Sequence, residues 1–129
     1  MSKYNNKKRV MIVDDAGFTR AMLKNIINDT NYAEVIAEAK NGKEAIMLYE
    51  KLKPDMVTMD LIMPEVGGLE AIDSILKIDK SASIIVVSAI GQQDLILEAT
   101  KKGAKDFIRK PFKKDQVVEI LERHIKART

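Results

Sequence analysis

The sequence predicts an α/β fold with a doubly wound parallel sheet of five strands, and two features of its patterning carry that prediction. Apolar runs of four to seven residues alternate with longer segments in which apolar residues recur at helical spacing. The runs are apolar almost throughout, which is typical of parallel strands covered on both faces. Because no linker, repeat or low-complexity stretch interrupts the pattern, we expect one domain over residues 1–129, with a basic N-terminal tail at about 1–8.

The expected strands are the short apolar runs, which cover residues 9–13, 33–37, 56–59, 84–87 and 106–109. Right-handed crossovers that place helices on both faces of the sheet favour the flavodoxin-like strand order 2-1-3-4-5. In that order the first and third strands are neighbours, and the winding direction changes between them.

The expected helices follow the strands in turn and cover residues 17–29, 42–52, 65–78, 91–102 and 112–127. In the first helix, Phe18, Met22 and Ile26 form the apolar stripe expected to face the core. The corresponding stripes of the second and last helices consist of Ala45, Leu48 and Leu52, and of Val117, Ile120, Leu121 and Ile125. Residues that favour turns or helix ends mark the boundaries: Asn41-Gly42, Lys53-Pro54-Asp55, Gly67-Gly68 and Gly103.

Composition excludes several classes of function. The chain has no cysteine, which excludes disulfides, thiolate metal sites and cysteine catalysis. No apolar run approaches the ~20 residues of a membrane span, and the N-terminus lacks the apolar core of a signal peptide, so we expect a cytoplasmic protein that does not bind membranes. The net charge of +3 raises the question of nucleic acid, but the basic residues are not interleaved with surface aromatics. This pattern favours a solvated basic face, and we expect a monomer without a nucleic-acid partner.

Polar side chains follow four of the expected strands. Asp14 and Asp15 follow the first strand, Asp60 the third, Ser88 the fourth and Lys110 the fifth. Parallel strands end at the same edge of a sheet, so these groups should meet there. Crowded carboxylates recruit a cation, and oxygen ligands without His or Cys favour Mg²⁺ or Mn²⁺. With the metal in place, Asp60 can attack phosphorus as a nucleophile.

Four stretches carry a resemblance to a known family. They are residues 10–15 (VMIVDD), 59–64 (MDLIMP), 87–89 (VSA) and 107–112 (FIRKPF). In this order and spacing they resemble the receiver domain of two-component response regulators, and most of all the stand-alone chemotaxis regulators (CheY-like). The resemblance covers about residues 8–127.

The resemblance implies a role for each residue at the metal site. Asp60 matches the phosphoacceptor, and Asp15 matches a direct Mg²⁺ ligand. Asp14 matches the acid that reaches the metal through water, and Ile62 matches the residue that offers its backbone carbonyl.

The phosphate-binding and switch residues are implied in the same way. Ser88 matches the hydroxyl that moves onto the phosphoryl group, with the Ala89 backbone beside it, and Phe107 stands where the family has a rotating aromatic switch. Lys110 matches the phosphate-binding lysine, whose peptide bond to Pro111 is expected to be cis. Two positions depart from the pattern: Phe107 lacks the hydroxyl of the Tyr found in many relatives, and Gly67-Gly68 replaces the more usual Asn-Gly or Asp-Gly, where only a local effect on the loop is expected.

The implied function is a phosphorylation switch. A histidine kinase would phosphorylate Asp60, and the surface of the fourth helix, fifth strand and fifth helix would then bind an output protein of the motility or chemotaxis machinery. Leu95, Ile96 and Phe107 are the candidate partner contacts. The apolar arc of the fourth helix centres on Ile96, whereas the resemblance places that residue near the partner surface; one of residues 95–97 should face water. His124 is expected to be solvated.

Other functions fit parts of the same pattern. A phosphorelay carrier, or an adaptor that works without phosphorylation, would have the same fold. A phosphatase of the haloacid-dehalogenase type needs an acid two residues after its nucleophile, where this chain has Ile62. A flavin-binding domain should present hydroxyl and backbone N–H groups in its first loop, where this chain has Asp14 and Asp15. We therefore expect a signalling domain that takes part in its own phosphorylation and dephosphorylation, and not an enzyme.

Overall fold

The computed structural model describes residues 6–125, which form one five-stranded parallel sheet in the order β2-β1-β3-β4-β5. The strands are β1 (Lys8–Val13), β2 (Ala33–Ala39), β3 (Met56–Asp60), β4 (Ile84–Ser88) and β5 (Asp106–Arg109). The helices between and after them are α1 (Gly17–Asp29), α2 (Gly42–Leu52), α3 (Gly68–Ile78), α4 (Gln93–Lys102) and α5 (Lys114–His124). The predicted fold class and strand order are confirmed.

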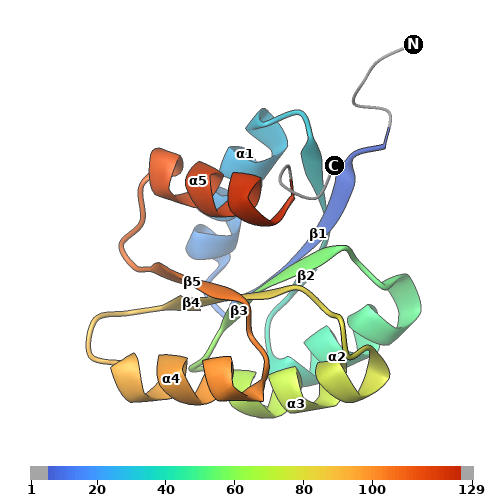
Figure 1. Cartoon of the computed structure of the whole chain (residues 1–129), viewed down its shortest axis with the longest axis vertical. Coiled ribbons are helices and arrows are strands. Elements are labelled where there is room, and N and C mark those ends of the chain that lie inside the picture. Colours follow the sequence, from blue (N-terminus) through green and yellow to red (C-terminus); the bar gives the residue numbers. More distant parts are fainter. Residues whose placement is uncertain (1–5, 126–129) are drawn as a thin grey trace.

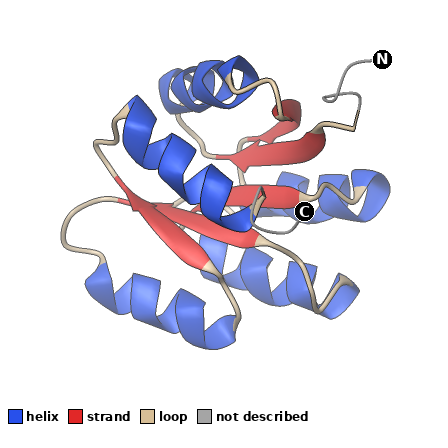
Figure 2. Ribbon diagram, turned by 45° about the horizontal axis from the view of Figure 1, so that its top comes forward, coloured by secondary structure: helices blue, strands red, loops and turns tan. Residues whose placement is uncertain are grey.

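Helices cover both faces of the sheet. Helices α1 and α5 lie on one face, and α2, α3 and α4 lie on the other, as Figures 1 and 2 show. Successive strand residues point to opposite faces, so the strands supply two separate cores. Ile12 and Val87 pack with Leu23 and Leu121 on the α1/α5 face, whereas Met59 packs with residues of the opposite face. Both faces of the central strands β3 and β4 are buried, as the unbroken apolar runs predicted, whereas the edge strands β2 and β5 are partly exposed.

The strand register brings the carboxyl ends of four strands together. Val13 pairs with Met59, Asp60 pairs with Val87, and Ser88 pairs with Arg109. The residues that follow these pairs therefore emerge side by side at one edge of the sheet. This register places the polar residues singled out above.

Several predicted boundaries differ from the structure by a few residues. Helices α3, α4 and α5 start two or three residues later than expected, because the residues ahead of them form the loops at the carboxyl edge of the sheet. The last helix ends at His124 instead of residue 127; positions 126–127, like positions 1–5 of the expected tail, lie outside the described residues. Lys8, assigned to that tail, already belongs to β1.

Two predictions about side-chain environment were wrong, one of them in part. The buried residues of α1 are Leu23 and Ile27, and Ile26 of the predicted stripe is partly buried against the same core, whereas Phe18 is 77% exposed and Met22 is exposed as well. His124 is half-buried instead of solvated, because its Nε2 lies 2.8 Å from Oδ2 of Asp106.

Among the described residues, no helix is both long and apolar enough to cross a membrane.

Candidate functional site

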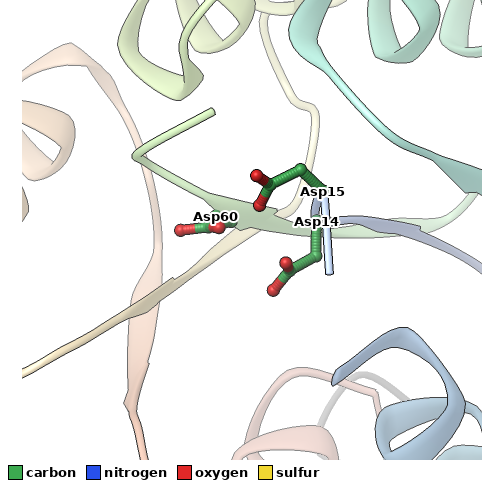
Figure 3. A group of neighbouring side chains, drawn as sticks. All are labelled: Asp14, Asp15 and Asp60. Atoms are coloured by element: carbon green, nitrogen blue, oxygen red, sulfur yellow. The ribbon is translucent and has the colours of Figure 1, made fainter. Parts of the chain in front are cut away.

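Three aspartates meet at the carboxyl edge of the sheet. Asp14 and Asp15 directly follow β1, and Asp60 is the last residue of the neighbouring strand β3. One carboxylate oxygen from each lies within 4.8 Å of the other two, and Figure 3 shows the three side chains together at the strand ends. Asp14 and Asp60 are buried, and Asp15 is exposed. The cluster therefore has two fixed carboxylates and one that water can reach.

Lys110 lies beside two acids of the cluster. It follows β5, and its Nζ lies 3.0 Å from Oδ2 of Asp14 and 3.6 Å from Oδ2 of Asp60. Its peptide bond to Pro111 is cis. Burial favours the neutral amine of Lys110, but the two neighbouring carboxylates outweigh it and raise the pKa of the lysine. The side chain is therefore a stable cation that contacts two of the three acids.

Asp14 is held in place by contacts on both sides of its carboxylate. Its Oδ1 accepts a hydrogen bond from the backbone N–H of Ala16 (2.8 Å), and its Oδ2 accepts one from Lys110. Its own backbone carbonyl accepts a bond of 2.7 Å from Nη1 of Arg20 in α1. These contacts fix the carboxylate in the loop between β1 and α1, so its position does not depend on a bound ion.

Asp60 is the acid whose charge the surroundings disfavour most. Burial, together with the nearby Asp14 carboxylate, raises the pKa of Asp60 to about 6. The Lys110 ammonium and the Ile62 N–H, which donates to Oδ1 at 3.3 Å, act in the opposite direction without cancelling the rise. A second cation at this point would relieve the remaining repulsion.

The donor set fits a hard divalent cation. All three groups are carboxylates, which are the ligands that Mg²⁺ and Mn²⁺ prefer, and Asp15 is open to water on its outer side. Mg²⁺ usually takes one or two carboxylates and keeps several waters, so such an arrangement suits it. Ile62, whose backbone carbonyl is the expected fourth metal ligand, lies in the loop after Asp60, and its side chain is 55% exposed.

Ser88 and Ala89 lie beside Asp60 at the end of β4. Ser88 is fully buried, and its Oγ has no hydrogen-bond partner among the described residues. A buried hydroxyl of this kind gains free energy from any acceptor that comes within reach, so Ser88 is available to a ligand bound at Asp60. The backbone N–H of Ala89, by contrast, is already engaged: it donates a 2.9 Å bond to Oε1 of Gln92. Sequence reasoning missed Gln92, because nothing in a lone glutamine at a helix start indicates such a contact.

Phe107 and the candidate partner residues of α4 differ in their exposure. Phe107 in β5 is 40% exposed, and the guanidinium of Arg109 lies 6.0 Å from the centre of its ring. Leu95 and Ile96 are partly buried against the core, whereas Leu97 is 55% exposed. Leu97 is therefore the most exposed apolar residue of this segment, and Leu95 and Ile96 are partly exposed beside it.

The comparisons with known proteins agree with this geometry. Residues 10–122 match the model of the response regulator receiver domain family, so the chain belongs to that family. It is similar to the chemotaxis proteins CheY of Thermotoga maritima (59% identity, covering 90% of this chain and 96% of the relative) and Listeria monocytogenes (53% identity, covering 92% and 98%).

Solved structures give the same answer. The response regulator domain of Thermotoga maritima CheB superposes with a TM-score of 0.83 at 36% identity, covering 95% of this chain and 96% of that one. A chain of the CheX–CheY complex with BeF3 and Mg²⁺ from Borrelia burgdorferi superposes with a TM-score of 0.84 at 34% identity, covering 90% and 87%. The predicted class, a CheY-type response regulator of chemotaxis, is confirmed, and the chain is a signalling domain.

Proposed function

We propose that Asp60 is the phosphoacceptor of this receiver domain and that it accepts a phosphoryl group from a histidine kinase in the presence of Mg²⁺. The observation that carries this proposal is that Asp60 lies beside two other carboxylates and within 3.6 Å of the Lys110 ammonium at the carboxyl edge of the sheet. Asp14, Asp15, Asp60 and the Ile62 backbone carbonyl are the proposed metal ligands, with Mn²⁺ as a substitute. The bound ion would neutralise charge on the carboxylates and on the incoming phosphoryl group.

In the proposed reaction an Asp60 carboxylate oxygen forms the new bond to phosphorus. The bond from phosphorus to the imidazole nitrogen of the donor histidine breaks, and its electron pair leaves with the imidazole. The metal would take one phosphoryl oxygen and Lys110 another, and the Ser88 hydroxyl together with the Ala89 N–H would contact the third. Lys110 is already a cation within 3.6 Å of Asp60, and the unpartnered Ser88 hydroxyl would gain an acceptor, so both are suited to these roles.

The signal would leave through a protein surface. We propose that phosphorylation pulls Ser88 inward and shifts Phe107, which changes the face formed by α4, β5 and α5 and its affinity for an output protein of the chemotaxis machinery. Leu95, Ile96 and Phe107 are the proposed partner contacts. The exposed Leu97 beside them adds apolar surface to the same face. The whole chain would act in the cytoplasm as one monomeric domain and would take part in its own dephosphorylation.

Intact-mass measurement tests the proposal. The protein is incubated with Mg²⁺ and acetyl phosphate, alongside Asp60→Asn and a sample with the metal chelated. We expect one phosphoryl group on the parent protein and none in the other two samples. Asp60 is not the phosphoacceptor if Asp60→Asn is still labelled. The same conclusion follows if neither acetyl phosphate nor a phosphorylated kinase domain leaves an adduct on the folded parent protein.

A further inference from the structure

The side chain of Gln92 accepts a hydrogen bond from the backbone N–H that the proposed phosphoryl group would use. The Ala89 N–H lies one residue beyond the buried Ser88, and it donates to the side-chain oxygen of Gln92 at 2.9 Å. Gln92 directly precedes the first residue of α4, and its side chain reaches back over the loop that joins β4 to this helix. The carboxamide oxygen is thus bound where a phosphoryl oxygen would bind.

We propose that Gln92 is a positioning residue that competes with the phosphoryl group for the Ala89 N–H, and so ties occupancy of the site to the start of α4. This inference rests on the proposed function, because it takes Asp60 as the phosphoacceptor. An N–H group makes one well-aligned bond, so the two oxygens exclude each other. A phosphoryl oxygen carries charge and bonds more strongly than a neutral carboxamide, so it displaces Gln92 when Asp60 is phosphorylated.

The surroundings of Gln92 support a displaceable contact. Ala89 and Ile90 are exposed, with Ile90 at 72%, and Gly91 has a positive φ of 94°, so the loop is held by few side-chain contacts. Gln92 makes no side-chain cap of α4, although its backbone carbonyl accepts the first helical bond, from the N–H of Ile96 (3.0 Å). Release of its side chain therefore removes the link between the Ala89 N–H and the residue that precedes α4, five positions before the exposed Leu97.

The affinity for beryllium fluoride in the presence of Mg²⁺ measures the competition, since this anion stands in for a phosphoryl group on a carboxylate. Gln92→Met keeps the length of the side chain and removes its oxygen. Loss of this competing hydrogen bond should tighten the binding of beryllium fluoride by about two- to tenfold. Gln92→Glu keeps an oxygen and adds charge, so it should weaken binding. Gln93→Ala is the matched control, because Gln93 is exposed and makes no contact with Ala89; its affinity should equal that of the parent protein.

The amide resonance of Ala89 provides a readout that a general effect on stability would not move. Without ligand, the proton shift of Ala89 should change in Gln92→Met and stay unchanged in Gln93→Ala. After beryllium fluoride is added, the parent and Gln92→Met should give the same shift, because both then donate to the ligand. An unchanged or weaker affinity in Gln92→Met, or an Ala89 resonance that does not respond to this change, would overturn the inference. A parent protein that binds no beryllium fluoride with Mg²⁺ would instead count against the proposed function, while the ligand-free spectra would still test the contact.

Discussion

At the scale of single residues, the negative charge on Asp60 destabilises the folded state. The pKa of Asp60 rises from 3.8 to about 6, through burial first and the Asp14 carboxylate second. The folded state therefore holds this proton more tightly than the unfolded chain does. A raised pKa contributes stability that is present below about pH 4 and is lost as the pH rises through about 6. At neutral pH, without a metal, the charged Asp60 lowers the free energy of unfolding.

We expect Asp60→Asn to stabilise the metal-free protein at pH 8, by about 1–2 kcal/mol, because the amide is neutral and its oxygen can still accept the Ile62 N–H. The gain should be much smaller at pH 4, where the parent carboxyl is protonated in the folded state and nearly half protonated in the unfolded chain. Urea unfolding with a chelator present at the two pH values measures both gains. Glu50→Gln, which changes an exposed acid of α2, is the control and should change little at either pH. A loss of stability at pH 8 in Asp60→Asn would contradict the assigned cause.

The positions of the site residues could be predicted from the sequence, but their hydrogen bonds could not. Asp14, Asp60, Ser88 and Lys110 follow apolar runs, and parallel strands end at one edge, so the pattern alone brings them together. Whether an oxygen is free or already bound depends on side-chain geometry over a few ångströms. The bond from Ala89 to Gln92 and the missing partner of the Ser88 hydroxyl are both of that kind.

At the scale of elements, α1 shows why a helical pattern can be assigned to the wrong face. Its sequence contains two pairs of apolar residues, each with a spacing of four positions: Phe18 with Met22, and Leu23 with Ile27. Arg20 decides between them, because its guanidinium bonds the Asp14 carbonyl and Glu38 of β2 and so must face the sheet. Leu23 and Ile27 follow Arg20 by three and seven positions and share its face, whereas Phe18 lies about half a turn away. Periodicity alone does not contain these polar contacts.

The start of α3 explains one of the two adjacent glycines ahead of it. A Cβ on Gly68 would lie 2.4 Å from the carbonyl oxygen of Asp60 and 2.6 Å from the Cα of Leu61, so the helix starts directly against the end of β3. A Cβ on Gly67 would lie 3.7 Å from the Leu61 carbonyl oxygen, which is an ordinary contact. Glycine is therefore required at position 68 and replaceable at position 67.

We expect Gly68→Ala to lower the free energy of unfolding by about 1–3 kcal/mol, since backbone atoms must move to make room. The same movement displaces Asp60, so phosphorylation by acetyl phosphate should slow as well. Gly67→Asn is the matched variant; it places a capping residue before α3 and should leave stability within a few tenths of a kcal/mol or slightly raise it. Urea unfolding and the rate of phosphorylation measure both. Equal effects of the two changes would show that the close approach at Gly68 is unimportant.

At the scale of the whole molecule, the site exists only when the sheet is complete. Its residues come from β1, β3, β4 and the end of β5, and the ion pair between Asp14 and Lys110 joins positions 96 residues apart. The two cores hold these strands from opposite faces, so the acids stay crowded at the edge although they repel one another. The unfolded chain has no such cluster. A cation that binds the acids must therefore stabilise the entire fold.

Mg²⁺ should accordingly raise the unfolding temperature, and the rise should depend on pH. A ligand that binds only the folded state adds about 2.7 kcal/mol at a hundredfold excess over its Kd. Protonation of Asp60 removes one of the three carboxylates, so the affinity for the ion should fall as the pH drops through about 6. Thermal unfolding with and without Mg²⁺ at pH 8 and pH 5 should show a larger shift at pH 8. Asp15→Asn should lose most of that shift, whereas Glu70→Gln, an exposed acid of α3 outside the cluster, should keep it. An Mg²⁺ effect that is equal at both pH values would mean that the ion binds without Asp60.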